Sequence, residues 1–442
     1  MNNPFKEEKK PLFKTRSKNY TQSVEERNYL QCEYIGSNAA IDIIAEACAC
    51  CWDKKVPDTY EERCEYVAKR TRTGHTSILE HSNCVMYIKA VGNVYVTDLI
   101  KFLSWNKYLN VSMVQFENNS YGVLISGSYR AYSYLYTESD DLNNSVLHSI
   151  TFNLYHYAPM AAFEDIVKLG LMDANEFERY KDAEIDENDM FTYNYKHEIN
   201  ENLEIIGIDD YEKLVNKLAT TDIDFLRHLT KRDLIKHVTV TVLFKNMSRI
   251  ITQQLCRHRN AITQESQRYV DYSKACFNSP ALFKDNIDPE FEYRIKFGTS
   301  GFMNMTLQQI GEACVNLYSM LHNKVMFGTH ALVQEDARAF LPGNVQCRKI
   351  YMTFTYDKLF KFLLLREASG AQAEIRKYAT ELGAWIRANT EFSTKEITDG
   401  LTKPKMMCEP DSYLDMVIDE IEEEINVTED DYIKAAGLNE EE

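Results

Sequence analysis

Residues 236–259 read KHVTVTVLFKNMSRIITQQLCRHR, and this stretch joins a strand pattern directly to a helix pattern. The run Val238–Phe244 consists of β-branched and apolar residues and follows the period of two that is typical of a strand. The run Ser248–Cys256 follows the helical period, with Asn246 as the expected cap. The residues of that helix expected to face the core are Ile250, Ile251 and Leu255. The stretch therefore predicts a strand that leads into a helix, as in an α+β fold.

The segment that follows the predicted helix is basic, although the chain has a formal net charge of −17. Residues 257–269 read RHRNAITQESQRY. Arginine donates two parallel hydrogen bonds to a phosphate, so this segment favours a site for a small anion. Because successive helical residues are about 100° apart, Arg257 and Arg259 are expected to point to nearly opposite sides, one toward a nucleotide and one toward a second ligand. The polar run Thr263–Arg268 is expected to be a loop that lines the pocket.

The composition limits the classes of function. The chain has 442 residues, of which 44% are hydrophobic, and is long enough for two or three domains. Its negative charge argues against general binding to nucleic acid or to an acidic membrane surface. We find no apolar run of membrane-spanning length and no signal-peptide core, so a cytoplasmic location is expected. Among the eleven cysteines, Cys48, Cys50 and Cys51 are interpreted as the buried face of a helix, and no metal site is expected.

Two parts of the chain share a faint internal repeat. The repeated segments, first copy before second, are Glu80-His81 and Lys236-His237, Cys84–Ile88 and Val238–Phe244, Glu117–Tyr121 and Glu265–Tyr269, and Leu124–Tyr132 and Tyr351–Leu359. Where the second copy has the basic residues 257–259, the first has Ser104-Trp105-Asn106, so the first copy has lost the basic motif. Chance similarity between strand–helix patterns is the alternative interpretation.

These patterns predict an α+β fold of two related copies, each a mixed or antiparallel sheet flanked by helices. The expected divisions are a flexible basic arm at 1–25, a degenerate first copy at 26–136, a mostly helical insertion at 137–232, a second copy at 233–400, and an acidic tail with one amphipathic helix at 401–442.

Four segments resemble, in the same order, the signature segments of the flavin-dependent thymidylate synthases. They are Gly74–His81, Arg257–Tyr269, Asp336–Pro342 and Leu365–Arg376. In that family an Arg-His-Arg precedes a loop that ends Ser-x-Arg-Tyr, as it does here. The resemblance covers residues 26–90 and 235–390 and is carried by four motifs rather than one.

The resemblance implies conversion of dUMP to dTMP, with FAD as cofactor and with methylene-tetrahydrofolate and NADPH as co-substrates. The dUMP-binding residues it implies are Gln254, Arg257, Glu265, Ser266, Gln267, Arg268, Arg338 and Arg366. The FAD-binding residues it implies are His75, Ser77, Arg130, Arg257, His258, Arg259, Glu265 and Lys361. Arg366 would be the catalytic residue, because a fixed cation stabilises negative charge on the uracil ring. His258 is either a proton shuttle or, as we favour, a donor that orients the flavin.

The resemblance also implies a homo-oligomer with sites built between subunits. A tandem chain would reach this as a homodimer that forms a pseudo-tetramer, and a homotetramer is the alternative. We expect the guanidinium groups that bind the nucleotide to converge on it; these are Arg257, Arg268, Arg338 and Arg366.

The sequence departs from the family pattern near the expected flavin site. Thr355 and Asp357 stand where Asn and Arg are common, Lys361 where Asn or His is common, and Gly370 where His is common. The loop that follows the Arg-His-Arg, residues 260–269, is one residue shorter than in the family, and we call it the signature loop. The first copy, with residues 126–130, is closer to the flavin-contacting pattern. The two copies are therefore expected to divide the work, with Ser77 and Arg130 serving FAD. The alternatives are a related C5 modification such as hydroxymethylation, or a non-catalytic protein that binds a nucleotide or flavin.

Overall fold

The structure is a computed structural model, and it describes residues 30–37, 40–91, 109–117, 120–132, 192–193, 197–297, 299 and 301–402. The expected arm at 1–25, nearly all of the acidic tail and residues 104–106 lie outside the described residues. The described part divides into a first unit, residues 30–132, and a second unit, residues 192–402. Among the described residues, no helix has both the length and the apolar character that crossing a membrane requires.

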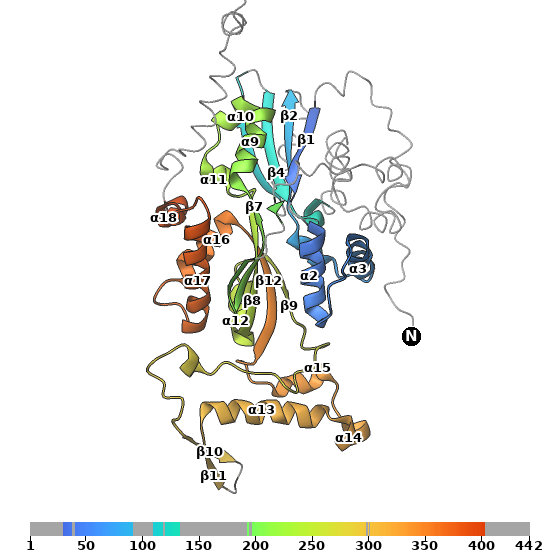
Figure 1. Ribbon diagram of the computed structural model, residues 1–442, viewed down its shortest axis with the longest axis vertical. Coiled ribbons are helices and arrows are strands. Elements are labelled where there is room, and N and C mark those ends of the chain that lie inside the picture. Colours follow the sequence, from blue (N-terminus) through green and yellow to red (C-terminus); the bar gives the residue numbers. More distant parts are fainter. Residues whose placement is uncertain are drawn as a thin grey trace, which may run out of the picture.

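Each unit is built on an antiparallel sheet, which confirms the predicted α+β class (Figure 1). The first sheet has the order β1-β2-β4-β3, and its strands are β1 (Leu30–Ser37), β2 (Cys84–Val91), β3 (Asn110–Gln115) and β4 (Ser120–Gly127). The second sheet has the order β5-β7-β8-β12-β9, and β6 pairs with β7. Its strands are β5 (Thr192–Tyr193), β6 (His197–Asn200), β7 (Leu203–Asp209), β8 (Thr239–Ser248), β9 (Ala261–Gln264) and β12 (Gln346–Thr355).

Helices cover both sheets. In the first unit they are α2 (Ala40–Trp52), α3 (Tyr60–Arg72) and the 3₁₀ turn η2 (Thr76–His81). In the second unit they are α9 (Tyr211–Thr221), α10 (Ile223–Arg227), α11 (Lys231–Leu234), α12 (Arg249–Cys256), α16 (Tyr356–Arg366), α17 (Ala373–Asn389) and α18 (Thr394–Thr402). Local signals start several of them. Thr59 and Glu62 form a capping box at α3, and the Asp210 side chain accepts from the Lys213 amide at α9.

The strand pairings of the two sheets match residue by residue. Strand β1 pairs with β2 as β7 pairs with β8, and each pair has a register shift at the same place, between Tyr34 and Gly36 in one and between Ile205 and Gly207 in the other. The β2–β4 pairing likewise repeats in β8–β12, and the β3–β4 pairing repeats in β9–β12. Because a bulge is a specific local feature, a shared bulge at one position is stronger support for a common frame than strand order alone.

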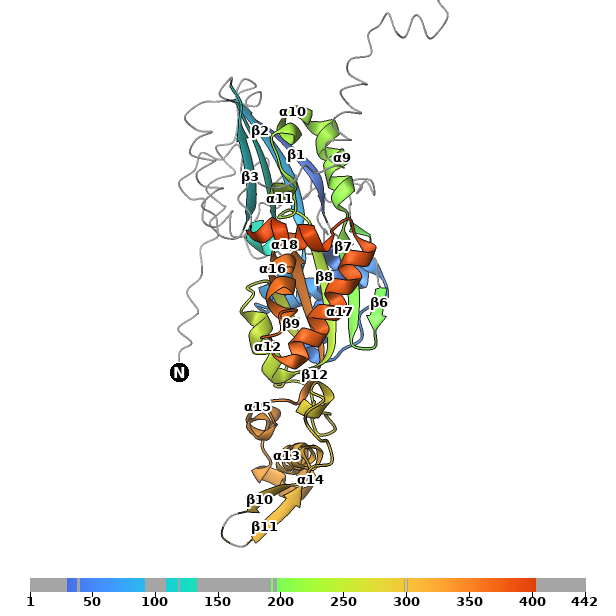
Figure 2. The same ribbon diagram turned by 90° about the vertical axis from the view of Figure 1, so that its left-hand side faces the viewer.

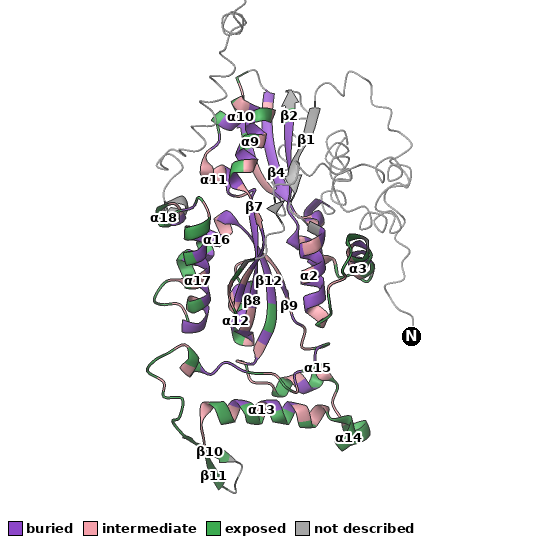
Figure 3. Cartoon of the chain, in the orientation of Figure 1, coloured by how far each residue is buried: buried purple, intermediate pink, exposed green. Residues whose placement is uncertain are grey.

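The two units exchange their helices. Helix α2 of the first unit packs on the second sheet, where Ile43 and Ala47 join a buried cluster with Leu243 and Tyr351. Helices α9 and α10 of the second unit pack on the first sheet, where the Phe225 ring lies 4.9 Å from that of Tyr87. Figure 1 shows α9 and α10 beside the first sheet and α2 beside the second. Each unit therefore buries apolar residues against the other, and the main buried cluster contains residues of both units (Figure 3).

Two buried histidines make this exchange reciprocal. His81 of the first unit bridges two hydroxyls of the second sheet, Thr353 at 2.9 Å and Thr263 at 2.8 Å. His237 of the second unit bridges two hydroxyls of the first sheet, Ser126 at 2.8 Å and Ser112 at 2.9 Å. The four hydroxyls occupy equivalent positions under the matched pairing.

A third part of the second unit stands away from the body. It runs between β9 and β12 and contains η4 (Pro280–Leu282), the hairpin β10 (Tyr293–Phe297) and β11 (Gly301–Met305), α13 (Leu307–His322), α14 (Lys324–Phe327), η5 (Gly328–His330), α15 (Gln334–Ala337) and η6 (Arg338–Phe340). Figure 2 shows it below the second sheet. Its exposed apolar residues include Leu282, Phe302, Met303, Val325, Met326 and Val333.

Several expectations from the sequence are confirmed and others are corrected. The predicted strand and helix around residue 246 are β8 and α12, but the N-cap of α12 is Ser248 and Asn246 lies within β8 with a φ of 56°. Ile250 is 48% exposed rather than buried, because it lies on the outer side of α12. The run from Thr263, expected to be a loop, begins inside β9, where it pairs with β12.

The repeat and its boundaries also differ in detail from the expectation. The matched pairing sets Gln264 against Met113, so Glu265 corresponds to Val114 and not to Glu117. Strand β7 joins the second sheet, so within the described residues that sheet begins before residue 233. Cys48 and Cys50 are buried on α2, as predicted, and Cys51 is half-buried.

Candidate functional site

The basic segment lies where α12 ends and the chain reverses into β9. Ile251 and Leu255 are fully buried and anchor the helix to the core. Arg257 is the C-cap, and Arg259 has a φ of 52°, a left-handed conformation that turns the chain back. Cations at a helix C-terminus interact favourably with its dipole, which favours Arg257 and Arg259 at this position.

Arg366, at the end of α16, is held against this turn. Its Nε donates to Nε2 of His258 at 3.0 Å, and its Nη1 donates to Oε1 of Gln254 at 3.2 Å. Gln254 in turn donates through Nε2 to Oε1 of Gln372 at 2.6 Å. Arg257 has no hydrogen-bond or ion-pair partner among the described residues. We call these five residues the Arg366 group.

The electrostatics of the Arg366 group favour an anion. Burial, and secondly the charge of Arg366, lower the pKa of His258 to about 4, so this imidazole is neutral at neutral pH. Since its Nε2 accepts from Arg366, the proton of His258 resides on Nδ1, which leaves Nδ1 as a donor. Burial and repulsion from Arg257 lower the pKa of Arg366. The two guanidinium groups repel each other, and an anion between them would relieve that repulsion.

Arg268 and Arg338 form a second group around Glu335. Arg268 pairs through Nε with Oε1 of Glu335 at 3.0 Å, and Arg338 donates through Nε to the backbone carbonyl of Glu335 at 3.0 Å. The amide of Arg268 also donates to Oγ of Ser266 at 3.2 Å. Gln267 lies between them in the chain and is half-buried. We call these residues the Arg338 group.

The two groups do not meet within one chain, contrary to the expectation that four arginines converge. The Arg366 group lies where α12 and α16 cover one side of the second sheet, and the Arg338 group lies at α15, beyond the lower end of β12 (Figure 1). No hydrogen bond or ion pair links a member of one group to a member of the other in the described part of the chain. The physical reason is that α12 and β9 run in opposite directions, so the loop after β9 emerges at the far end of the sheet.

Glu265, expected to contact both ligands, is fully engaged by the protein. It is 2% exposed, and both its oxygens accept from Arg348, whose Nη2 lies 2.8 Å from Oε1. This ion pair raises the pKa of Arg348, whose Nη1 also pairs with Asp53 at 3.1 Å. Glu265 therefore fastens the signature loop to β12.

The first unit supports the same loop. The Ser266 amide donates to the carbonyl of Cys51 at the end of α2, at 3.2 Å. The ring of Trp52 stacks on Tyr269 with 6.0 Å between centroids, and meets the edge of His75 at 5.0 Å. His75 is thus beside the signature loop, and Ser77, in η2, is exposed.

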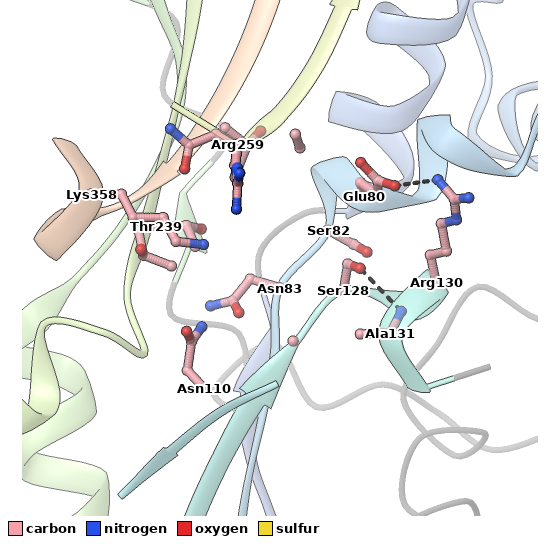
Figure 4. A pocket seen from close by; sticks show the side chains of 15 residues that line it. Glu80, Ser82, Asn83, Asn110, Ser128, Arg130, Ala131, Thr239, Arg259 and Lys358 are labelled. Carbon is pink, nitrogen blue, oxygen red and sulfur yellow. Dashed lines mark hydrogen bonds and ion pairs between the residues drawn. The ribbon is translucent and has the colours of Figure 1, made fainter. Parts of the chain in front are cut away.

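A cavity of about 310 Å³ lies between the two units (Figure 4). Of the predicted flavin-binding residues, Arg130 and Arg259 line it. Arg130 forms an ion pair with Glu80 at the cavity wall, and Arg259 extends into the open space. Lys361 does not line the cavity and pairs with Asp357 at 3.3 Å.

Several residues around these sites were not predicted from the sequence. Glu335 bridges two arginines, Arg348 holds Glu265, and Lys358 lines the cavity. Glu335 directly precedes the family-like segment Asp336–Pro342. Its position three residues before Arg338 was the only feature of the sequence that could have indicated a role for it. The partners of Arg348 and the position of Lys358 depend on contacts between distant segments, which no motif reports.

Comparison with known proteins agrees with this arrangement. Residues 193–389 match the family described as "Thymidylate synthase complementing protein", which places the match in the second unit. Several relatives carry the name flavin-dependent thymidylate synthase. The protein from Geobacter sulfurreducens is 32% identical over 179 residues, which are 40% of this chain and 69% of the relative. Those from Pyrococcus furiosus and Nitratidesulfovibrio vulgaris are 31% and 32% identical, over 34% and 33% of this chain and 54% of each relative.

The match to the Geobacter sulfurreducens protein extends over more than two thirds of that relative, whereas the chain spans about half the length of the other two. The matched range contains the signature loop, both arginine groups and the helices that carry them. The chain therefore belongs to the family of flavin-dependent thymidylate synthases.

Proposed function

We propose that this protein converts dUMP to dTMP with FAD, methylene-tetrahydrofolate and NADPH. The observation that carries the proposal is the Arg366 group, in which His258 and Gln254 fix Arg366 while no carboxylate of the described residues neutralises it. A preorganised cation of this kind is suited to a ring that becomes negatively charged during reaction. Family membership supports the proposed substrate class, and the geometry supports the choice of Arg366.

Within the proposed reaction, Arg366 lies beside the pyrimidine and stabilises negative charge on it, which makes C5 a better nucleophile. Its two hydrogen bonds restrict the guanidinium to one orientation before substrate arrives, so little reorganisation is required. His258 remains neutral and keeps Nδ1–H available as a donor, which favours an orienting role over a proton shuttle. Arg257 and Gln254 position the nucleotide from the same turn.

The residues around the cavity fit a flavin dinucleotide. Arg259 and Lys358 lack partners among the described residues, and both polar atoms of the Asn260 side chain are buried without one. These donors match the phosphates and polar edges of FAD. When bound, FAD would supply the redox chemistry and the handling of the one-carbon unit. Two further predicted flavin ligands, His75 and Ser77, belong to the first unit.

The separation of the two arginine groups supports a site shared between chains. In the proposed assembly, the Arg366 group of one chain and the Arg338 group of its partner bind one dUMP, with Arg268 on the phosphate. Glu335 occupies Arg268 in the isolated chain and must release it when phosphate binds. A homodimer with two such sites is the simplest closed arrangement. A cytoplasmic location is part of the proposal.

Product analysis by mass tests this function. The full chain is incubated with dUMP, FAD, NADPH and methylene-tetrahydrofolate, and each component is omitted in turn. We expect dTMP only in the complete mixture. A nucleotide heavier by a hydroxymethyl group would replace the proposal with hydroxymethylation, and unchanged dUMP together with bound flavin would indicate a non-catalytic binding protein.

A further inference from the structure

The cavity between the units lies on an approximate two-fold axis. Under the matched strand pairing, eight of the fifteen lining residues form equivalent pairs from the two units, namely Asn83 and Thr239, Asn110 and Ala261, Ser128 and Thr355, and Ala131 and Lys358. In a symmetric dimer of one unit, both sides of such a cavity would carry the same groups. Here they do not, and the differences indicate what the cavity binds.

The described residues on the first-unit side of the cavity offer no free cation to an anion. Arg130 is neutralised by an ion pair with Glu80, and the position equivalent to Lys358 is Ala131. Figure 4 shows the Glu80–Arg130 pair at the wall, directed toward each other rather than into the open space. No unpaired cation lines this side among the described residues.

The second-unit side is open and positively charged. Lys358 and Arg259 both line the cavity, and neither has an acidic partner among the described residues. The neighbouring carboxylate, Asp357, is already occupied, since it accepts from the Thr355 hydroxyl at 2.5 Å and pairs with Lys361. Asn260 adds an amide whose donor and acceptor atoms are buried and unsatisfied. Buried polar atoms without partners are costly, so a ligand that satisfies them gains affinity.

The size and chemistry of the cavity define the ligand class. A volume of about 310 Å³ suits a nucleotide fragment rather than a whole dinucleotide. Two unpaired cations and a free amide match phosphate oxygens, which accept charge-assisted hydrogen bonds. We propose that this axial cavity binds the diphosphate of one nucleotide cofactor per chain, on the second-unit side only, with Lys358 as a binding residue.

This inference deepens the proposed function and rests on it for the identity of the cofactor as FAD. It differs from the expectation drawn from family resemblance, which assigns the contact to Lys361. It also predicts one flavin for each chain of two units, because the first unit has Ala131 at the position equivalent to Lys358, and its Arg130 is paired with Glu80.

Flavin titration of the full chain, followed by quenching of flavin fluorescence, tests the inference. We expect one FAD per chain, and a loss of affinity of about ten-fold or more for Lys358→Ala, since the lysine makes a charge-assisted contact. Lys361→Ala should change the affinity less than two-fold, because its charge is already paired. Lys377→Ala, exposed on α17, serves as the neutral control, and Lys358→Arg should retain most of the affinity. Riboflavin, which lacks phosphate, should bind equally to wild type and Lys358→Ala.

The outcomes separate the inference from the proposed function. FAD bound equally by wild type and Lys358→Ala, or two FAD per chain, would overturn the inference and leave the flavoenzyme proposal in place. If wild type binds no FAD but binds ADP, and Lys358→Ala weakens that binding, the cavity assignment holds and the flavin proposal fails. Circular dichroism of each variant excludes misfolding as the cause of lost binding.

Discussion

At the scale of single residues, two histidines have similar surroundings, although one belongs to the first unit and the other to the second. His81 and His237 are fully buried. Each neutral ring donates a hydrogen bond to one hydroxyl of the other unit and accepts a hydrogen bond from a second hydroxyl of that unit. Burial lowers the pKa of each to about 3, against an ordinary value of 6.5. They therefore stay neutral when folded and hold the two units together without a buried charge.

These histidines make stability depend on pH. The unfolded chain takes up protons on both as the pH falls below about 6.5, while the folded chain does not until about pH 3. Their contribution is fully present above pH 6.5 and is lost as pH falls. When the pH falls from 7 to 5, the proton uptake of each histidine in the unfolded chain should lower the free energy of unfolding by about 2 kcal/mol. Urea unfolding at both pH values measures this.

The controls are two glutamine variants. Gln also bridges hydroxyls but does not titrate, so H81Q/H237Q should lose clearly less stability between pH 7 and pH 5 than wild type does. H228Q, which changes an exposed histidine, should behave like wild type. Equal pH dependence in wild type and the double variant would show that these histidines do not carry the effect.

Residue-level prediction from the sequence succeeded where both partners lie in motif segments. The Arg-His-Arg turn and the segment that begins at Leu365 were both expected at the nucleotide site, and the structure brings His258 and Arg366 together although they are 108 residues apart. The sequence did not predict the internal partner of Glu265, whose role toward a ligand stays a prediction. The partner that occupies it, Arg348, lies 83 residues away in a strand with no motif.

At the scale of elements, the strands with clear alternation were predictable. The segments at 84–88, 238–244 and 351–355 are strands β2, β8 and β12, and each runs where the pattern placed it. Strand β7 was missed because LEIIGID is a short apolar run, which periodicity alone cannot distinguish from a buried helix segment. Its pairing with β8 extends the second sheet into the region expected to be a helical insertion.

The packing of α10 on the first sheet gives a test of the helix exchange. A Cβ at Gly122 of β4 would overlap the Phe225 ring of α10 and lie 2.9 Å from Oη of Tyr87. Gly122→Ala should therefore destabilise the protein by about 1–3 kcal/mol, the usual cost of overpacking a core. Chemical denaturation measures the change.

Gly301→Ala is the matched control, because a Cβ at Gly301 of the exposed hairpin meets nothing within 4 Å. It should leave stability almost unchanged. If Gly122→Ala were as stable as Gly301→Ala, α10 of the second unit would not pack closely on the first sheet.

At the scale of the whole molecule, the two units resemble a dimer joined in one chain. They share strand order, register, a bulge and a reciprocal pair of histidines, while only the second unit falls within the family match. We propose a duplication in which the first unit has become a support for the second. The faint sequence repeat predicted the duplication. It did not predict the exchange of helices, because that exchange depends on contacts between distant segments, which no periodic pattern reports.

The third part of the second unit, the arm between β9 and β12, has the features of an interface between chains. It carries Arg338 and exposes apolar side chains such as Phe302, Met303 and Val325 (Figure 3). Exposed apolar surface of this kind is typical of an interface. In the proposed homodimer the arm brings the Arg338 group of one chain to the Arg366 group of the other.

Co-expression of two inactive variants, Arg366→Ala and Arg338→Ala, tests this central claim most directly. Each variant alone should release almost no tritium from 5-labelled dUMP, since every site lacks one arginine. A heterodimer purified through two different tags has one intact site of two and should show about half the wild-type rate. A heterodimer as inactive as its parents, beside a fully active wild-type dimer carrying the same tags, would contradict a site shared between chains.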